Sequence, residues 1–247
     1  MMLLSQSTCA ILLAWSFLSN RAHGREIIAY RTVSRAEAEY INENERPFRD
    51  RELDLRSEEH NQLGQGFYTV NEPGGWPNVG PQWHCAIAAD GEKVKAVRKV
   101  WIPEYYWTTR RVGRKSKSKS TRERVQLWTY ESKNEAAILR YIESLGVPHP
   151  ERAWRLALVP SLSASVKLQM VIPTETINGN ELDFWARCWE TRAELLASQP
   201  QPQPVDWMSW EGIAGDPEPV DPESSDSSSE EREARWYQRW LDWWQRS

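Results

Sequence analysis

Few residues in this chain combine the type and the spacing that catalysis or metal binding requires. Beyond residue 24 the histidines are His60, His84 and His149, and none stands at H-x-x-x-H or C-x-x-C spacing from a second ligand. Cys85 follows His84, but neighbouring side chains of a strand point to opposite faces, so the two are not expected to form a thiolate–imidazole pair. The sequence therefore predicts no metal site and no cysteine nucleophile.

The glycines at Gly64 and Gly66 do not belong to a common nucleotide-binding loop. Gly64-x-Gly66 lacks the third glycine and the following helix of the dinucleotide fingerprint, and the chain contains no G-K-[S/T] loop. The sequence therefore gives no support for Rossmann or P-loop enzymes.

The most basic segment is residues 110–122, with the sequence RRVGRKSKSKSTR, and its composition predicts a solvated loop. Clustered Lys and Arg suit polyanion binding, or a nuclear address after uptake by another cell; the plainer alternative is a flexible loop without a specific partner. The whole chain has 31 Lys and Arg against 35 Asp and Glu, a net charge of -4. This balance excludes a protein whose entire surface neutralises phosphates.

The elements that position these residues are predicted from apolar periodicity and turn chemistry. A strand at residues 26–33 precedes a helix that begins at the capping box Ser34-x-x-Glu37 and ends near residue 43. The other predicted strands lie at residues 64–70, 83–88, 99–103, 124–130 and 166–173. The other predicted helices lie at residues 92–97, 134–145 (capped by Ser132) and 180–197, the last carrying Cys188.

Three short motifs follow one another along these elements. They are Tyr30-Arg31 in the first strand, Gly64-Gln65-Gly66-Phe67-Tyr68-Thr69, and the strand Leu168-Gln169-Met170-Val171-Ile172-Pro173. Their order resembles the ADP-ribosyltransferase superfamily, especially its secreted toxin-like members. Those proteins carry Tyr-Arg, then Gly-x-Gly-aromatic-Tyr or Ser-Thr-Ser, then E-x-E before an apolar-Ile-Pro stretch. The chain is also similar to uncharacterised secreted fungal proteins.

The resemblance implies an α/β (α+β) domain with two facing, mostly antiparallel sheets, flanking helices and a cleft for NAD. The NAD-binding residues that it implies are Arg31, Gly66 and Tyr68, with Arg31 on the phosphates and Tyr68 stacked on the nicotinamide. Each also has a structural interpretation: an ion-paired arginine, a turn glycine and a half-buried strand aromatic.

The third motif departs from the family, because Lys167 and Gln169 stand where the two glutamates of E-x-E are expected. Gln169 at the catalytic position can accept a hydrogen bond but carries no charge to stabilise an oxocarbenium-like transition state. Transfer activity is then expected to be degenerate. Glu175 or Glu131 would substitute only in another alignment of the strand.

Both ends of the chain differ in composition from the middle. Residues 1–24 contain a short apolar stretch followed by Ala22-His23-Gly24, which predicts a signal peptide and a secreted, extracellular protein. Removal of this segment leaves Cys85 and Cys188, which predicts one disulfide; the alternative is two separate buried thiols. No transmembrane segment is predicted in the mature chain.

The globular domain is predicted to span residues 25–198; the acidic, Ser-rich stretch that starts at Asp216 gives residue 214 as a later end. Residues 199–232, rich in Pro, acidic residues and Ser, are expected to form a disordered linker, and residues 233–247 a Trp-rich helix that docks on the domain or on a partner. The chain contains 15 Trp, so wide rings must be buried in a core, a ligand platform or a partner groove.

Two functions are therefore expected. The first is a secreted ADP-ribosyltransferase-like toxin or effector that binds NAD and acts on an unknown target protein in another organism's cells. The alternative is a non-enzymatic secreted interaction module that uses Trp-rich surfaces. Contact with polyanions through residues 110–122 is a further expectation.

Overall fold

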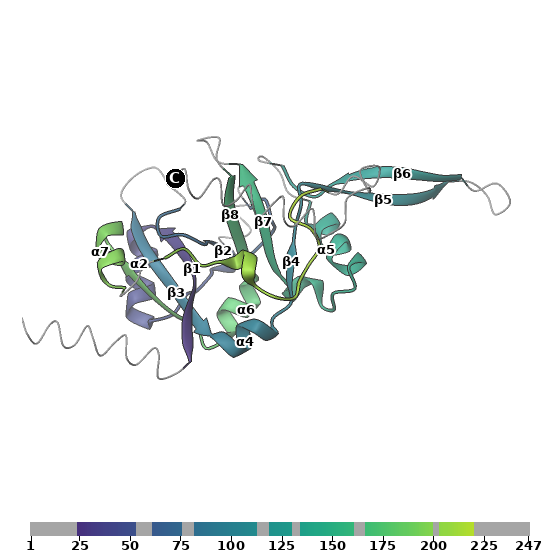
Figure 1. The fold of residues 1–247 in the computed structure, drawn as a ribbon. Helices are drawn as coiled ribbons and strands as arrows, with labels where there is room; N and C mark the ends of the chain where they lie inside the picture. Colours follow the sequence, from purple (N-terminus) through teal and green to yellow (C-terminus); the bar gives the residue numbers. More distant parts are fainter. Residues whose placement is uncertain are drawn as a thin grey trace, which may run out of the picture.

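The computed structural model describes residues 24–52, 61–75, 82–112, 119–129, 134–160, 166–199 and 203–219. Within these ranges the chain is a mixed α/β protein, as predicted. An eight-stranded sheet forms the body, in the order β10-β4-β7-β8-β2-β1-β3-β9 (Figure 1). Its strands are β1 (Arg25–Val33), β2 (Phe67–Val70), β3 (Trp83–Asp90), β4 (Lys99–Trp101), β7 (Trp154–Pro160), β8 (Val166–Ile172), β9 (Trp185–Trp189) and β10 (Ile213–Ala214).

Most neighbouring strands of this sheet are antiparallel, and β4 pairs in parallel with β7 and with β10. The resemblance led us to expect two facing sheets; the body instead has one continuous sheet, whose two halves meet where Tyr30 of β1 pairs with Val70 of β2. A separate two-stranded ribbon, β5 (Tyr105–Val112) and β6 (Lys119–Gln126), projects from the body (Figure 1).

Helices cover both faces of the large sheet. They are α2 (Arg35–Asn44), α4 (Gly91–Ala96), α5 (Glu135–Ser144), α6 (Thr174–Gly179) and α7 (Arg192–Ala197), with short 3-10 turns η2 (Pro150–Arg152) and η3 (Trp207–Ser209). Residues of α2, α4, α6 and η3 share one hydrophobic cluster with the first face. On the second face α5 packs over β4, β7 and β8, whereas Leu195 of α7 packs against Tyr30, Val70 and Ala86.

The predicted helix at residues 180–197 is wrong. Asn180 and Asp183 both have positive φ, and the Asn180 side chain accepts a hydrogen bond from the Phe184 N–H at 2.8 Å, which closes a turn instead of a helix. Trp185–Trp189 then pairs with β3, and only Arg192–Ala197 is helical. Apolar residues at this spacing fit either element, and pairing with β3 decides between them.

This strand places Cys188 directly opposite Cys85, and the two sulfur atoms are bonded. The predicted disulfide is therefore confirmed. The N-cap of α5 also differs from the prediction: Asn134 fills that position, where its side chain accepts a hydrogen bond from the Ala137 N–H.

The body extends past the predicted boundary at residue 198. Trp207 is fully buried, and its indole N–H donates to the Ile28 carbonyl at 2.8 Å. The Tyr30 hydroxyl lies 3.1 Å from both the Gln199 side-chain oxygen and the Gln203 carbonyl, so the strap of residues 203–219 is tied to the core. The predicted linker at 199–232 therefore begins too early. The predicted signal peptide, except Gly24, and the predicted Trp-rich helix lie outside the described residues.

Candidate functional site

The three strands that carry the predicted motifs are neighbours in the sheet, in the order β8, β2, β1. Their side chains do not all point the same way. Paired residues of neighbouring strands point to the same face of a sheet. Tyr68 pairs with Val171, which packs against α5 on the second face. Gln169 pairs with Val70, which pairs with Tyr30 and packs against α7 on the same face, so Gln169 belongs to the second face too. Arg31 follows Tyr30 and belongs to the first face. The structure thus brings Tyr68 and Gln169 onto one face and separates Arg31 from them.

Arg31 is held by partners within the body. Its Nε donates to Glu37 at 3.0 Å, its Nη1 donates to the Tyr68 carbonyl at 2.7 Å, and its guanidinium lies 4.6 Å from the Phe67 ring centroid. Only 14% of its side chain is exposed. These contacts join β1, β2 and α2, which makes the ion-paired structural interpretation the better one for this arginine.

Tyr68 and the glycines beside it tie down the segment before β2. The Tyr68 hydroxyl donates to the Gly64 carbonyl at 2.7 Å and accepts from the Leu63 N–H at 3.0 Å, and burial raises its pKa far above the usual range. Gly64 and Gly66 both have positive φ. A Cβ at Gly64 would overlap the Glu135 and Arg155 side chains, and one at Gly66 would lie 2.6 Å from the Ile172 carbonyl oxygen. Close packing therefore explains both glycines.

The ion pair beneath this segment was missed in the sequence. Arg155 is 2% exposed and forms two hydrogen bonds with the Glu135 carboxylate, at 2.9 and 2.8 Å. Its Nη1 also donates to the Leu63 carbonyl at 2.7 Å. One feature of the sequence could have revealed it: Arg155 is a charged residue within an otherwise apolar strand, and such a residue needs a partner.

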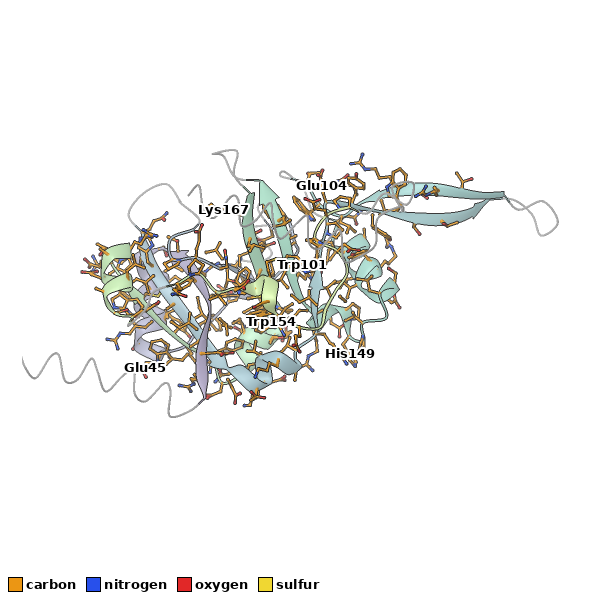
Figure 2. The ribbon with its side chains drawn as sticks, in the orientation of Figure 1. Glu45, Trp101, Glu104, His149, Trp154 and Lys167 are labelled. Atoms are coloured by element: carbon orange, nitrogen blue, oxygen red, sulfur yellow. A yellow bond between two sulfur atoms is a disulfide. The ribbon has the colours of Figure 1, made fainter. Side chains whose placement is uncertain are left out.

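Gln169 is the predicted catalytic residue, and it is 7% exposed. Its side-chain oxygen is buried and has no hydrogen-bond partner in the structure. Lys167, the other residue at an expected glutamate position, forms an ion pair with Glu72 (Figure 2 shows Lys167). Glu175 lies on α6 and pairs with Arg51, and Glu131 is outside the described residues. The second face therefore presents an amide, without charge, at the predicted catalytic position.

The basic segment predicted as a loop is largely part of the ribbon. Residues 110–112 belong to β5 and 119–122 to β6, and the two strands pair from Tyr105 with Gln126 to Val112 with Lys119. Local composition concealed this long antiparallel pairing, because neither strand shows an apolar alternation.

Arginines and aromatic rings form a ladder on one face of the ribbon. The Arg124 guanidinium lies 3.7 Å from the centroid of the Tyr105 ring, and that of Arg122 lies 5.3 Å from the Trp107 centroid. Both arginines reach diagonally across the strand pair toward the base of the ribbon. They are exposed, whereas the two rings are half-buried. We call these four residues the Arg–aromatic ladder.

The other face anchors the ribbon to the body. Tyr106 packs against Tyr141 of α5 with ring centroids 5.0 Å apart, and Tyr106 and Val125 join the cluster around α5. At the base the Gln126 amide nitrogen donates to the Glu104 and Trp128 carbonyls, at 3.1 and 2.7 Å (Figure 2 shows Glu104). The ladder is therefore on the face that points away from the core.

The ribbon concentrates positive charge in an acidic protein. Residues 105–126 contain eight Lys and Arg and one Glu, so 8 - 1 gives a net charge of +7. The whole chain carries -4, which leaves -11 for all other residues. A positive element that projects from a negative body attracts anions by its local field, although the total charge is negative.

Two further features concern the described residues only. No group of three or more His, Cys, Asp and Glu side chains in them is arranged to hold a metal ion. No helix in this part of the chain is long and apolar enough to cross a membrane.

Residues 61–216 match the model of a family described as "Family of unknown function (DUF5910)". The match spans more than half of the chain, which therefore belongs to this family. No curated protein and no solved structure gives a significant match.

Proposed function

We propose that this protein is a secreted binding protein that captures polyanions with the β5–β6 ribbon. The observation that carries the proposal is the Arg–aromatic ladder on a projecting ribbon whose two strands contain five Lys and Arg and one Glu. Guanidinium groups bind phosphate and sulfate oxygens through paired N–H donors. The Cys85–Cys188 disulfide supports the secreted location, because such bonds persist in oxidising compartments.

The tryptophans of the body support binding through the ribbon more than through Trp-rich surfaces. Those buried in the core are Trp101, Trp128, Trp154, Trp185 and Trp207. The core of the described residues therefore buries five of the chain's 15 Trp. Trp107, in contrast, lies in the ladder on the ribbon.

Retention on immobilised heparin tests the proposal. The wild-type protein should be retained at low salt and elute as salt rises, and the R122A/R124A variant should elute earlier. The matched control is R35A/K95A, which removes two exposed positive charges from α2 and α4 of the body. If the control elutes as early as the ribbon variant, the binding comes from overall charge and the proposal fails; it also fails if the wild type is not retained.

A second candidate function is the binding of NAD without transfer, on the second face of the sheet. One observation favours it: the buried side-chain oxygen of Gln169 lacks a hydrogen-bond partner and shares this face with Tyr68. A ligand amide would satisfy that oxygen. In this candidate Arg31 supports the strands and does not contact the phosphates.

Calorimetric titration with NAD tests this second function. Binding should weaken on Q169L and stay unchanged on R31K, which retains the charge beside Glu37. The absence of heat from the wild-type protein would reject it. Transfer activity that appears only in Q169E would show that the missing carboxylate alone had silenced an enzyme.

A further inference from the structure

We propose that the polyanion is a single-stranded nucleic acid, whose bases stack on the guanidinium planes of Arg122 and Arg124. This inference rests on the proposed polyanion-binding function and names its ligand. Two features of the ribbon carry it: the layered arrangement of the ladder and the direction in which the ladder points.

The ladder presents two similar platforms at a regular interval. Arg122 and Arg124 are two residues apart on β6, about 7 Å along a strand, and therefore share one face. Each guanidinium lies over a ring, and both arginine side chains are exposed, so solvent-borne flat groups can reach them. Arginine planes and aromatic rings are the surfaces on which unpaired bases stack, and such stacking tolerates any sequence.

Strand pairing and a contact with the body hold the ribbon in place. Its strands are paired along their whole length, and Tyr106 on the opposite face packs against Tyr141 of the body. The ladder is thus held on the outer side of a fixed element, so binding need not order a flexible loop.

The chemistry of the ladder favours a nucleic acid over other polyanions. A sulfated glycan uses the charges and the N–H donors at the edge of a guanidinium, but it has no flat bases to stack on the guanidinium face. An anionic membrane favours exposed apolar side chains, whereas arginines here lie over the Tyr105 and Trp107 rings. The Gln126 side chain is engaged at both ends, by Glu104 and by Arg124, so it does not read base edges. We therefore expect binding without sequence preference.

Fluorescence anisotropy with a labelled oligodeoxythymidine tests the inference, in the full-length secreted protein, over a series of salt concentrations. The decisive variant is R122K/R124K, which keeps both charges and removes both planes. It should bind the oligonucleotide about tenfold more weakly with an unchanged salt slope. The R122A/R124A variant should also lower the slope of log K against log salt by about 1.4, because two phosphate contacts are lost.

Heparin and a DNA duplex are the comparison ligands, and R35A/K95A is the control for charge removed elsewhere. R122K/R124K should lose much less retention on heparin than R122A/R124A loses, because its charges remain, and the single strand should bind more tightly than the duplex. Equal affinity of R122K/R124K and the wild type for the oligonucleotide would overturn the inference, as would tighter binding of the duplex. Retention on heparin without oligonucleotide binding would overturn the inference alone, whereas loss of both would also overturn the proposed function.

Discussion

Arg155 in the body and Arg124 in the ribbon are the same residue type in opposite settings. The Arg155 side chain is 3% exposed, and its guanidinium bonds to Glu135 and to the Leu63 carbonyl. Arg124 is exposed, lies over the Tyr105 ring and has one long contact with Gln126 at 3.5 Å. A buried arginine whose Nη groups bond within the fold stabilises that fold, whereas an exposed one on a paired ribbon can serve a ligand.

Arg31 belongs with Arg155 in this comparison. The sequence motifs predicted that Arg31 contacts a cofactor. Its guanidinium instead contacts Glu37, the Tyr68 carbonyl and the Phe67 ring. The body therefore uses its arginines to join strands and helices. We expect substitutions in the body to change stability, and substitutions in the ladder to change binding.

Removal of the disulfide should cause the largest loss in the free energy of unfolding of the body. The C85S/C188S variant opens a covalent loop whose ends are 103 residues apart. The chain-entropy model predicts a loss of about 4.7 kcal/mol in the free energy of unfolding. Guanidinium denaturation without reductant measures it. Where the variant still folds, its oligonucleotide affinity should equal that of the wild type, because the ladder is on a separate ribbon and both cysteines are in the large sheet. A parallel loss of affinity would contradict the division between body and ribbon.

Trp207→Ala tests whether the strap of residues 203–219 is part of the body. Trp207 is fully buried and its indole N–H bonds to the Ile28 carbonyl. Truncation should lower the free energy of unfolding by about 4 kcal/mol, from the cavity and the lost hydrogen bond. A control is Trp210→Ala, at a half-buried position nearby, which should cost less. A smaller loss in the free energy of unfolding than that of Trp210→Ala would show that this segment belongs to the predicted linker and not to the body.

Arg155→Met sharpens the comparison directly. It leaves the Glu135 carboxylate without its partner, and breaking such a pair costs about 3 kcal/mol. R122A/R124A should change the free energy of unfolding by less than about 0.5 kcal/mol, because both residues are on the surface. Urea denaturation measures both changes in the free energy of unfolding. Oligonucleotide affinity should show the reverse: R122A/R124A should lose more affinity than Arg155→Met. Similar stability losses would contradict the division of roles.

The sequence predicted what local pattern controls and missed what distant pairing controls. Strand β1 and helix α2 follow the alternation and the Ser34 cap, whose side chain accepts from the Glu37 N–H. The disulfide followed from the cysteine count and the compartment. The strand at Trp185–Trp189 depends on β3, about 100 residues earlier, and its local spacing also fits a helix.

The candidate sites show the same limit. The predicted Arg31 and Tyr68 lie on neighbouring strands, but the alternation of side chains across β1 and β2 places them on opposite faces. The basic segment was found by composition, and its function class was predicted as polyanion contact. The Arg–aromatic ladder was not predicted, because Arg124 contacts Tyr105 only when β5 and β6 pair.

The smallest expected effect concerns Lys99, a buried cation of the body. Its ammonium donates to the Val94 and Val97 carbonyls, and desolvation lowers its pKa to about 8. The unfolded chain then holds more protons than the folded one between about pH 8 and pH 10, so stability should rise with pH in that window. We expect a rise of about 1 kcal/mol in the free energy of unfolding between about pH 8 and 9.5, with solvent screening keeping it below the full shift.

Urea denaturation at both pH values measures this rise. Lys99→Met should remove the rise, and R122A/R124A should retain it, because the ladder arginines stay charged throughout. A wild-type protein whose stability does not change across this window would contradict the lowered pKa and show that the Lys99 ammonium is fully compensated by its carbonyl partners and by the Trp154 and Trp210 rings, 6.0 and 5.3 Å away.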